Sequence, residues 1–160
     1  ADREIKLGLL ADLLLSRQVL EESEPAGRPV AGGFISSRYG WRTDPITGRK
    51  SLHKGLDFAG KPGSDILAVG DGLVTLAGWR SGYGRTVEIR HGNGYLTRYG
   101  HNSELLVKKG ELVKQGQVIA KMGRTGRATG VHLHFEVLRN GKAVNPLKFV
   151  KRDKPQDDNG

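Results

Sequence analysis

The sequence has no cysteine among its 160 residues. This absence excludes disulfide bonds, a catalytic thiolate and zinc sites built on cysteine. Any metal site must therefore use histidine and carboxylate ligands, and the chain has only five histidines to supply them. The positions of these five residues consequently carry much of the information about function.

Long apolar runs and aromatic side chains are also scarce. No stretch approaches the roughly 20 apolar residues that a membrane-spanning helix needs, so we expect no membrane-spanning segment in this chain. Only 6% of the residues are aromatic, and no RNA-binding motif is present. A nucleic-acid surface of aromatic side chains on a basic sheet is therefore disfavoured, and we expect no nucleic acid as a partner.

Positive charge and glycine are both in excess. The 26 basic and 17 acidic residues give a net charge of +9, which favours an anionic partner such as nucleic acid, a membrane surface or a cell-wall polymer, or only keeps the surface solvated. Glycine accounts for 24 residues, about twice its usual share of ~7%. Because no glycine-rich linker is present, these glycines indicate many tight turns between short strands.

The apolar pattern divides the chain into three parts. Residues 4–22 carry leucines at helical spacing and are followed by a proline and a glycine, which predicts one N-terminal helix. This helix could pack on its own domain, cover a groove, belong to a longer upstream helical region or bind a regulatory partner. The predicted parts are a helix and linker (1–29), the main domain (30–150) and a disordered tail (151–160).

The main domain is predicted to be mostly antiparallel β-sheet. Alternating or β-branched runs separated by glycines lie at 73–79, 85–90, 95–100, 117–122 and 131–138. Between two of these runs, Gly92, Asn93 and Gly94 supply the positive-φ residues of a tight hairpin. His91 lies beside this turn, and we expect its side chain to be exposed and without a functional role.

Two histidines are one residue apart in GVHLHFEVL (130–138). Because side chains alternate between the faces of a strand, His132, His134 and Glu136 should share one face, and the apolar residues between them should share the core face. Two histidines on one face can both reach one metal ion. Alternation alone leaves open which of the two would be the ligand.

A second group lies in HKGLD, where His53 and Asp57 are four residues apart and fall on the same side of the chain. Imidazole and carboxylate are common zinc ligands, and a catalytic zinc takes three protein ligands and keeps one position open. His53, Asp57 and one histidine of the HLH pair would complete this set. Taken alone, Asp57 could instead cap a turn and His53 could be an ordinary loop histidine. A further histidine, His101, ends the predicted hairpin.

These pieces together resemble the LytM/lysostaphin-type zinc metallopeptidases. The resemblance covers about residues 33–148. The matching stretches are SSRYGWRTDPITG (36–48), HKGLDFAG (53–60), AVGDGLVTLAGW (68–79), RYGH (98–101), GQVIAKMGRTGRATGVHLHFEV (116–137) and NP (145–146). Members of this family hydrolyse peptide cross-bridges of bacterial peptidoglycan and have a β-rich fold with an open groove. The resemblance therefore implies an antiparallel β-sheet domain of this type.

The resemblance also implies the role of each histidine. The family's Zn²⁺ ligands correspond to His53, Asp57 and His134. Its catalytic histidines correspond to His101 and His132. All five positions of the pattern are filled in this chain, which argues against an inactive domain.

The chain has no H-E-x-x-H sequence, so the glutamate base of many zinc peptidases is missing. A histidine, whose ordinary pKa of about 6.5 suits proton transfer near neutral pH, can replace it. We expect His132 or His101 to act in this way. Arg38 and Tyr95 are candidate substrate-binding residues of the groove wall, with structural hydrogen bonding and packing as the alternatives.

The sequence therefore predicts a zinc-dependent endopeptidase that hydrolyses peptidoglycan cross-links, with the D-alanyl-diaminopimelate type inferred from the family's membership. Such a substrate implies a periplasmic or extracellular location. One alternative is a non-catalytic LytM-type module that activates other cell-wall hydrolases. Another is a carrier domain, because residues 105–123 resemble the hairpin of biotinyl and lipoyl domains, but this would leave the histidines unexplained.

Overall fold

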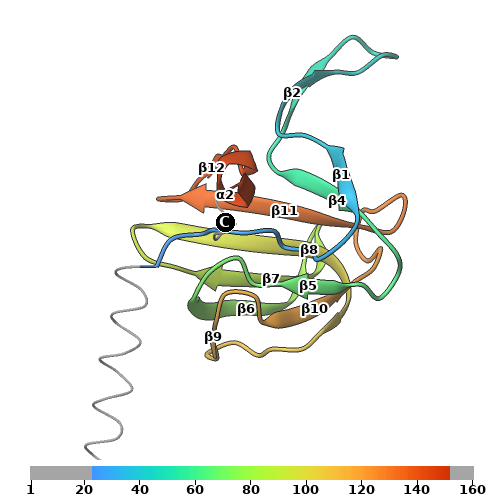
Figure 1. The fold of residues 1–160 in the computed structure, drawn as a ribbon. Helices are drawn as coiled ribbons and strands as arrows, with labels where there is room; N and C mark the ends of the chain where they lie inside the picture. Colours follow the sequence, from blue (N-terminus) through green and yellow to red (C-terminus); the bar gives the residue numbers. More distant parts are fainter. Residues whose placement is uncertain (1–22, 152–160) are drawn as a thin grey trace, which may run out of the picture.

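The computed structural model describes residues 23–151. They form a chain of short strands followed by one short helix, as Figure 1 shows. The elements are β1 (Phe34–Ser37), β2 (Gly40–Thr43), β3 (Lys50–His53), β4 (Leu56–Ala59), β5 (Asp65–Leu67), β6 (Gly72–Arg80), β7 (Gly84–Arg90), β8 (Tyr95–Leu105), β9 (Leu112–Val113), β10 (Val118–Met122), β11 (His132–Arg139), β12 (Lys142–Val144) and α2 (Leu147–Lys151). The prediction of a mostly antiparallel β fold is confirmed. The helix predicted for 4–22 and the tail beyond Lys151 lie outside the described residues.

Ten of these strands belong to one antiparallel sheet. Its main path runs β1-β4-β11-β8-β7-β6-β9, with β12 beside β11, while β10 pairs with both β8 and β5. Strands β2 and β3 form a separate hairpin, which projects from the rest of the domain in Figure 1. The main path makes β4, β11 and β8 neighbours, and these three strands carry most of the predicted site residues. Within the described part of the chain, no helix is long and apolar enough to span a membrane.

Side-chain alternation gives the sheet one apolar and one polar face. In β11, Leu133, Phe135 and Val137 are fully buried. Phe135 contacts Phe58 of β4 and Tyr99 of β8, with ring centroids 6.5 and 5.4 Å apart. Burying a side chain of this size stabilises a fold by roughly 1.5–3 kcal/mol, so this face fixes the position of the strands. The alternate residues of β11 are then left on the opposite, polar face.

The hairpin between β7 and β8 forms as predicted, with Asn93 at φ 57° and Gly94 at φ 81°. The prediction that His91 is exposed is wrong, because only 1% of this residue is accessible. The chain entering the domain covers the turn: the backbone N–H of Gly92 donates to the carbonyl of Ser23 at 2.5 Å. A side chain on Gly70 would come within 3.0 Å of the His91 ring, so this histidine is enclosed from two sides.

Residues 23–29, predicted as part of a linker, hydrogen-bond to the sheet domain. The N–H of Ala26 donates to the carbonyl of Val69 at 2.6 Å, and the N–H of Gly27 donates to that of Phe149 at 2.9 Å. The segment is therefore attached at both a loop of the sheet and the C-terminal helix. The division of the chain at residues 29 and 150 stays a prediction.

Candidate metal centre

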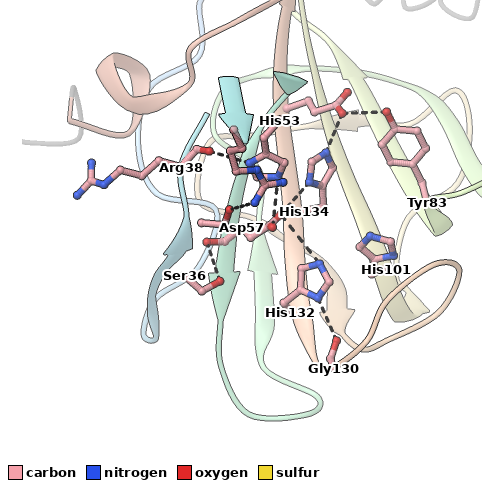
Figure 2. Close-up of polar contacts among 12 residues, drawn as sticks. Ser36, Arg38, His53, Asp57, Tyr83, His101, Gly130, His132 and His134 are labelled. Carbon is pink, nitrogen blue, oxygen red and sulfur yellow. Dashed lines mark hydrogen bonds and ion pairs between the residues drawn. The ribbon is translucent and has the colours of Figure 1, made fainter. Parts of the chain in front are cut away.

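The register between β4 and β11 brings an acidic residue and a histidine face to face. Asp57 lies directly opposite His134 in this antiparallel pair, and residues opposite each other in such a pair share one face. His134 Nδ1 is 2.8 Å from Asp57 Oδ1. His53, at the end of β3, places Nε2 at 3.2 Å from the other carboxylate oxygen, Oδ2. Figure 2 shows the three side chains pointing toward one another.

This donor set fits a zinc ion. One ligand atom from each of His53, Asp57 and His134 lies within 4.8 Å of the others. Tetrahedral zinc at bond lengths of ~2.0–2.2 Å separates neighbouring ligand atoms by about 3.3 Å. The separations of His134 Nδ1 from Asp57 Oδ1 (2.8 Å) and of His53 Nε2 from Asp57 Oδ2 (3.2 Å) are close to this value.

Three of the four histidines at the site have one ring nitrogen held by a backbone carbonyl. The carbonyls of Arg38, Thr125 and Gly130 lie 2.8, 2.6 and 3.0 Å from Nδ1 of His53, His101 and His132, respectively. A carbonyl can only accept a hydrogen bond, so each of these rings carries its proton on Nδ1. In the neutral ring, Nε2 then has a free lone pair, as a metal ligand or a proton acceptor requires.

His134 is oriented from the other side by Glu136. His134 Nε2 lies 2.7 Å from Glu136 Oε2, which leaves Nδ1 facing Asp57. Only 1% of Glu136 is accessible. The sequence places Glu136 on the histidine face of β11, but its role becomes visible only when its partners are known.

Glu136 is itself held by Tyr83, from the turn between β6 and β7, and by Arg98 of β8. The hydroxyl of Tyr83 donates to its Oε2 at 2.8 Å, and Arg98 Nη1 donates to its Oε1 at 2.6 Å. Arg98 Nε donates in turn to Glu88 Oε2 at 2.6 Å. Such partners of a metal ligand fix its ring orientation and typically change metal affinity when removed. Tyr83, Arg98 and Glu88 had no role in the predictions from sequence, because their contacts depend on strand order.

The electrostatics of the site favour a cation between His134 and Asp57. Burial alone would lower the pKa of His134, but the hydrogen bonds and charges of Asp57 and Glu136 outweigh burial and raise that pKa to about 9. Burial alone would raise the pKa of Asp57, whereas its bond to His134 and the nearby histidines hold the pKa below its ordinary value. A metal ion at this point would take the place of the proton on His134.

His101 and His132 lie beside these three residues. Their ring centroids are 4.7 Å apart, and the centroid of His101 is 6.1 Å from that of His134. His132 Nε2 is 4.0 Å from Asp57 Oδ1. Burial lowers the pKa of His101, which favours its neutral form at neutral pH. All five residues predicted from the histidine pattern are thus in one cluster.

The two predicted groove-wall residues are placed differently. Arg38 contributes its carbonyl to His53, while its guanidinium extends away from the histidines in Figure 2; a substrate contact by this side chain stays a prediction. The structure does not bring Tyr95 to the site. Tyr95 starts β8, six residues before His101, and is 4% exposed. Its ring packs against that of Phe149, with centroids 5.2 Å apart. Packing, the alternative for Tyr95, is what the structure shows.

Comparison with known proteins identifies the domain. Residues 51–146 match Peptidase family M23. The chain belongs to this family. The recognition of a LytM/lysostaphin-type domain is therefore confirmed, and the described residues form a metallopeptidase domain of this class.

Relatives and solved structures agree with this assignment. Peptidoglycan DD-endopeptidase ShyC of Vibrio cholerae is 48% identical over 105 residues, which are 66% of this chain and 24% of the relative. The lipoprotein NlpD/LppB homolog of Pseudomonas aeruginosa is 44% identical over 125 residues, 78% of this chain and 42% of the relative. This chain thus spans less than half the length of either relative, which leaves the activity of the whole protein to be inferred.

Two similar solved structures are peptidases. A zinc containing peptidase from Vibrio cholerae superimposes with a TM-score of 0.69 at 40% identity, covering 86% of this chain and 41% of that one. The catalytic domain of lysostaphin from Staphylococcus simulans gives a TM-score of 0.70 at 31% identity, covering 80% of this chain and 99% of that one. The second comparison shows that the described fold is about the size of a whole lysostaphin catalytic domain.

Proposed function

We propose that this domain is a zinc-dependent endopeptidase that hydrolyses peptide cross-links of bacterial peptidoglycan during cell-wall remodelling. The observation that carries the proposal is the convergence of three metal-ligand atoms with two further histidines whose Nδ1 atoms are each bound to a carbonyl. Relatives named peptidoglycan DD-endopeptidases support the D-alanyl-diaminopimelate type of cross-link. Such a substrate lies outside the cytoplasm, so the protein would act in the periplasm or at the cell surface.

His53, Asp57 and His134 would hold the zinc ion. When bound, zinc polarises a carbonyl group and lowers the pKa of water to about 7, which supplies a nucleophile near neutral pH. His101 and His132 then provide the proton transfers. In its neutral form each has a free lone pair on Nε2, because Nδ1 donates to a carbonyl, so either can accept a proton from the attacking water and return one to the leaving amine.

The positive charge of the chain fits the same substrate. A net charge of +9 attracts a wall polymer that carries carboxylates and raises the rate of encounter at low ionic strength. The buried polar group next to the metal centre does not add to this positive charge, because a single cation, Arg98, is paired there with two carboxylates, Glu88 and Glu136. The attraction would therefore come from the outer surface and not from the metal centre.

A non-catalytic module is the alternative function. One relative is named only as a lipoprotein homolog, and a similar solved structure belongs to the SpoIIQ-SpoIIIAH pore forming complex, with a TM-score of 0.68 at 33% identity. The complete set of three ligands and two flanking histidines favours catalysis, because a binding module would not need two further histidines whose Nε2 atoms are free to accept a proton.

The test incubates zinc-loaded protein with purified sacculi of two kinds, one cross-linked through D-alanyl-diaminopimelate and the other through glycine bridges. Mass spectrometry should detect new amino termini from the first kind. The His101→Ala variant should keep its zinc, measured by elemental analysis, and lose roughly 100-fold or more in turnover. Stoichiometric zinc without cleavage of either sacculus would instead establish the binding module, and loss of zinc in His101→Ala would overturn the division of roles.

A further inference from the structure

His101 lies in a bulge of β8 and not in a regular stretch of strand. Val87 of β7 pairs with Tyr99 of β8, whereas Arg85 pairs with Asn102, so β8 carries one residue more than β7 between these pairs. His101 has a φ of 66°, which lies in the left-handed region. A non-glycine residue populates this region about tenfold less, or lower still, than the right-handed one. Strain of this kind persists only where the surrounding structure holds it in place.

The bulge changes the face on which His101 lies. Tyr99 points into the core, where its hydroxyl accepts a hydrogen bond from Val69, and Gly100 lies opposite His134 on the other face. Regular alternation would therefore direct residue 101 back into the core. The extra residue reverses this alternation, as bulges next to functional sites commonly do, and places the His101 ring beside His132.

The side-chain amide of Asn102 closes the bulge. Its Nδ2 donates to the carbonyl of Tyr99 at 2.8 Å and to that of Arg85 at 2.9 Å. These carbonyls belong to the residue pairs on either side of the extra residue, and an amide group has two N–H donors to match them. Asn102 is fully buried, and its Oδ1 has no hydrogen-bond partner among residues 23–151. The two carbonyls alone therefore set the orientation of this amide.

Thr125 attaches the bulge to the loop before β11. Its hydroxyl donates to the carbonyl of Asn102 at 2.6 Å and accepts from the N–H of Arg85 at 3.0 Å. Its own carbonyl accepts from His101 Nδ1 at 2.6 Å. The loop has little room to shift, because a Cβ on Gly84 would lie 2.4 Å from the carbonyl carbon of Thr125. One residue thus holds both the backbone after His101 and the His101 ring.

We propose that Asn102 and Thr125 are positioning residues that keep His101 in its left-handed conformation and so direct its Nε2 toward the metal centre. Asn102 supplies the donors that the bulge needs, and the Thr125 hydroxyl joins the bulge to the carbonyl that fixes the ring. The consequence for catalysis rests on the proposed function, in which His101 transfers a proton. The effect on the backbone does not depend on it.

The kinetic test compares Thr125→Val, which removes the hydroxyl at nearly constant shape, with Thr125→Ser, which keeps it. Thr129→Val is the matched control, because Thr129 is an exposed residue of the same loop. With a soluble D-alanyl-diaminopimelate cross-linked muropeptide as substrate, Thr125→Val should lower kcat about 10- to 100-fold. KM and zinc content should stay within about twofold of the wild type, and the other two variants should keep kcat. Unchanged kcat in Thr125→Val, or equal losses in Thr125→Val and Thr125→Ser, overturns the proposal.

A crystal structure of zinc-loaded Thr125→Val tests the positioning role without any activity. His101 should leave the left-handed region, or its ring should turn away from His132, whereas Thr125→Ser should keep both. An unchanged His101 in the valine variant refutes the positioning role, whether or not the wild type cleaves peptidoglycan. If the valine variant does not fold, Thr125→Ala removes the same hydroxyl with a smaller side chain and takes its place in both measurements.

Discussion

Acidification should destabilise this domain through one buried histidine that lies outside the metal centre. His91 Nδ1 donates to the carbonyl of Asp71 at 2.7 Å, and its Nε2 accepts from the hydroxyl of Thr97 at 2.8 Å. The hydroxyls of Thr97 and Tyr99 are 2.8 Å apart, and because the Thr97 hydrogen is used toward His91, Tyr99 is the donor of this pair; the Tyr99 oxygen accepts from the N–H of Val69 at 3.1 Å. Each hydrogen bond in this series runs in one direction, and every donor in it has an acceptor only when His91 is neutral. A proton on Nε2 would make the Thr97 hydroxyl accept from His91 and donate to Tyr99, and the Tyr99 hydroxyl hydrogen would then have no acceptor within this series of bonds.

The size of the effect follows from the pKa of His91. Burial outweighs the bond to Asp71 and lowers this pKa from 6.5 to about 4. Between these values the unfolded state binds more protons than the folded state, so the contribution to stability is complete above pH ~6.5 and is lost as the pH falls toward ~4. A gap of about 2.5 units at about 1.36 kcal/mol each gives about 3.4 kcal/mol, of which about 2 kcal/mol is lost by pH 5.

Urea unfolding at pH 7 and pH 5 measures this loss, with His91→Gln as the reference that cannot titrate. The wild type should lose about 2 kcal/mol more than the variant over this interval. The comparison removes the contributions of other groups, including that of His134, whose raised pKa acts in the opposite direction. Equal losses in the two proteins would refute the assignment of His91 as a buried neutral group.

The remaining predictions concern metal affinity. Because the pKa of His134 is about 9 without metal, zinc binding at pH 7 should release about one proton, and the zinc affinity should fall about tenfold per pH unit below pH 9. Calorimetry in buffers of different ionisation enthalpy measures the number of protons released. Zinc binding without proton release would contradict the prediction. Glu136→Gln should weaken zinc binding about 10- to 100-fold in a chelator competition, while Glu104→Gln on the surface should leave it unchanged. Equal zinc affinity in the two variants would show that Glu136 does not support the metal centre.

Much of the fold and the cluster could be predicted from local pattern. Alternation along VHLHFEV fixes which residues share a face of β11, because the period of a strand is a property of the chain itself. The positive-φ residues Asn93 and Gly94 specify the hairpin for the same reason. The pairing of Asp57 with His134 is different: it depends on the register between β4 and β11, which are far apart in sequence.

The features that could not be predicted arise from contacts between distant segments. His91 is buried because residues 23–26 cross a turn that is locally indistinguishable from an exposed one. The side chain of Glu136 is held by Arg98 of β8, which also pairs with Glu88 of β7, and these strands come together only in the folded sheet. The bulge that turns His101 toward the site has no sequence signature of its own, since its donor is one asparagine side chain.

The position of His53 has a consequence for the integrity of the fold. His53 ends the separate β2–β3 hairpin, whereas Asp57 and His134 belong to the main sheet. A cation shared by these residues would join the hairpin to the sheet and link Asp57 to His134, which are 77 positions apart in the sequence, as a disulfide does in chains that have cysteine. Chelation of that cation would therefore loosen the hairpin, whose Arg42, Arg49 and Lys50 are exposed, and make it more susceptible to trypsin-like proteases.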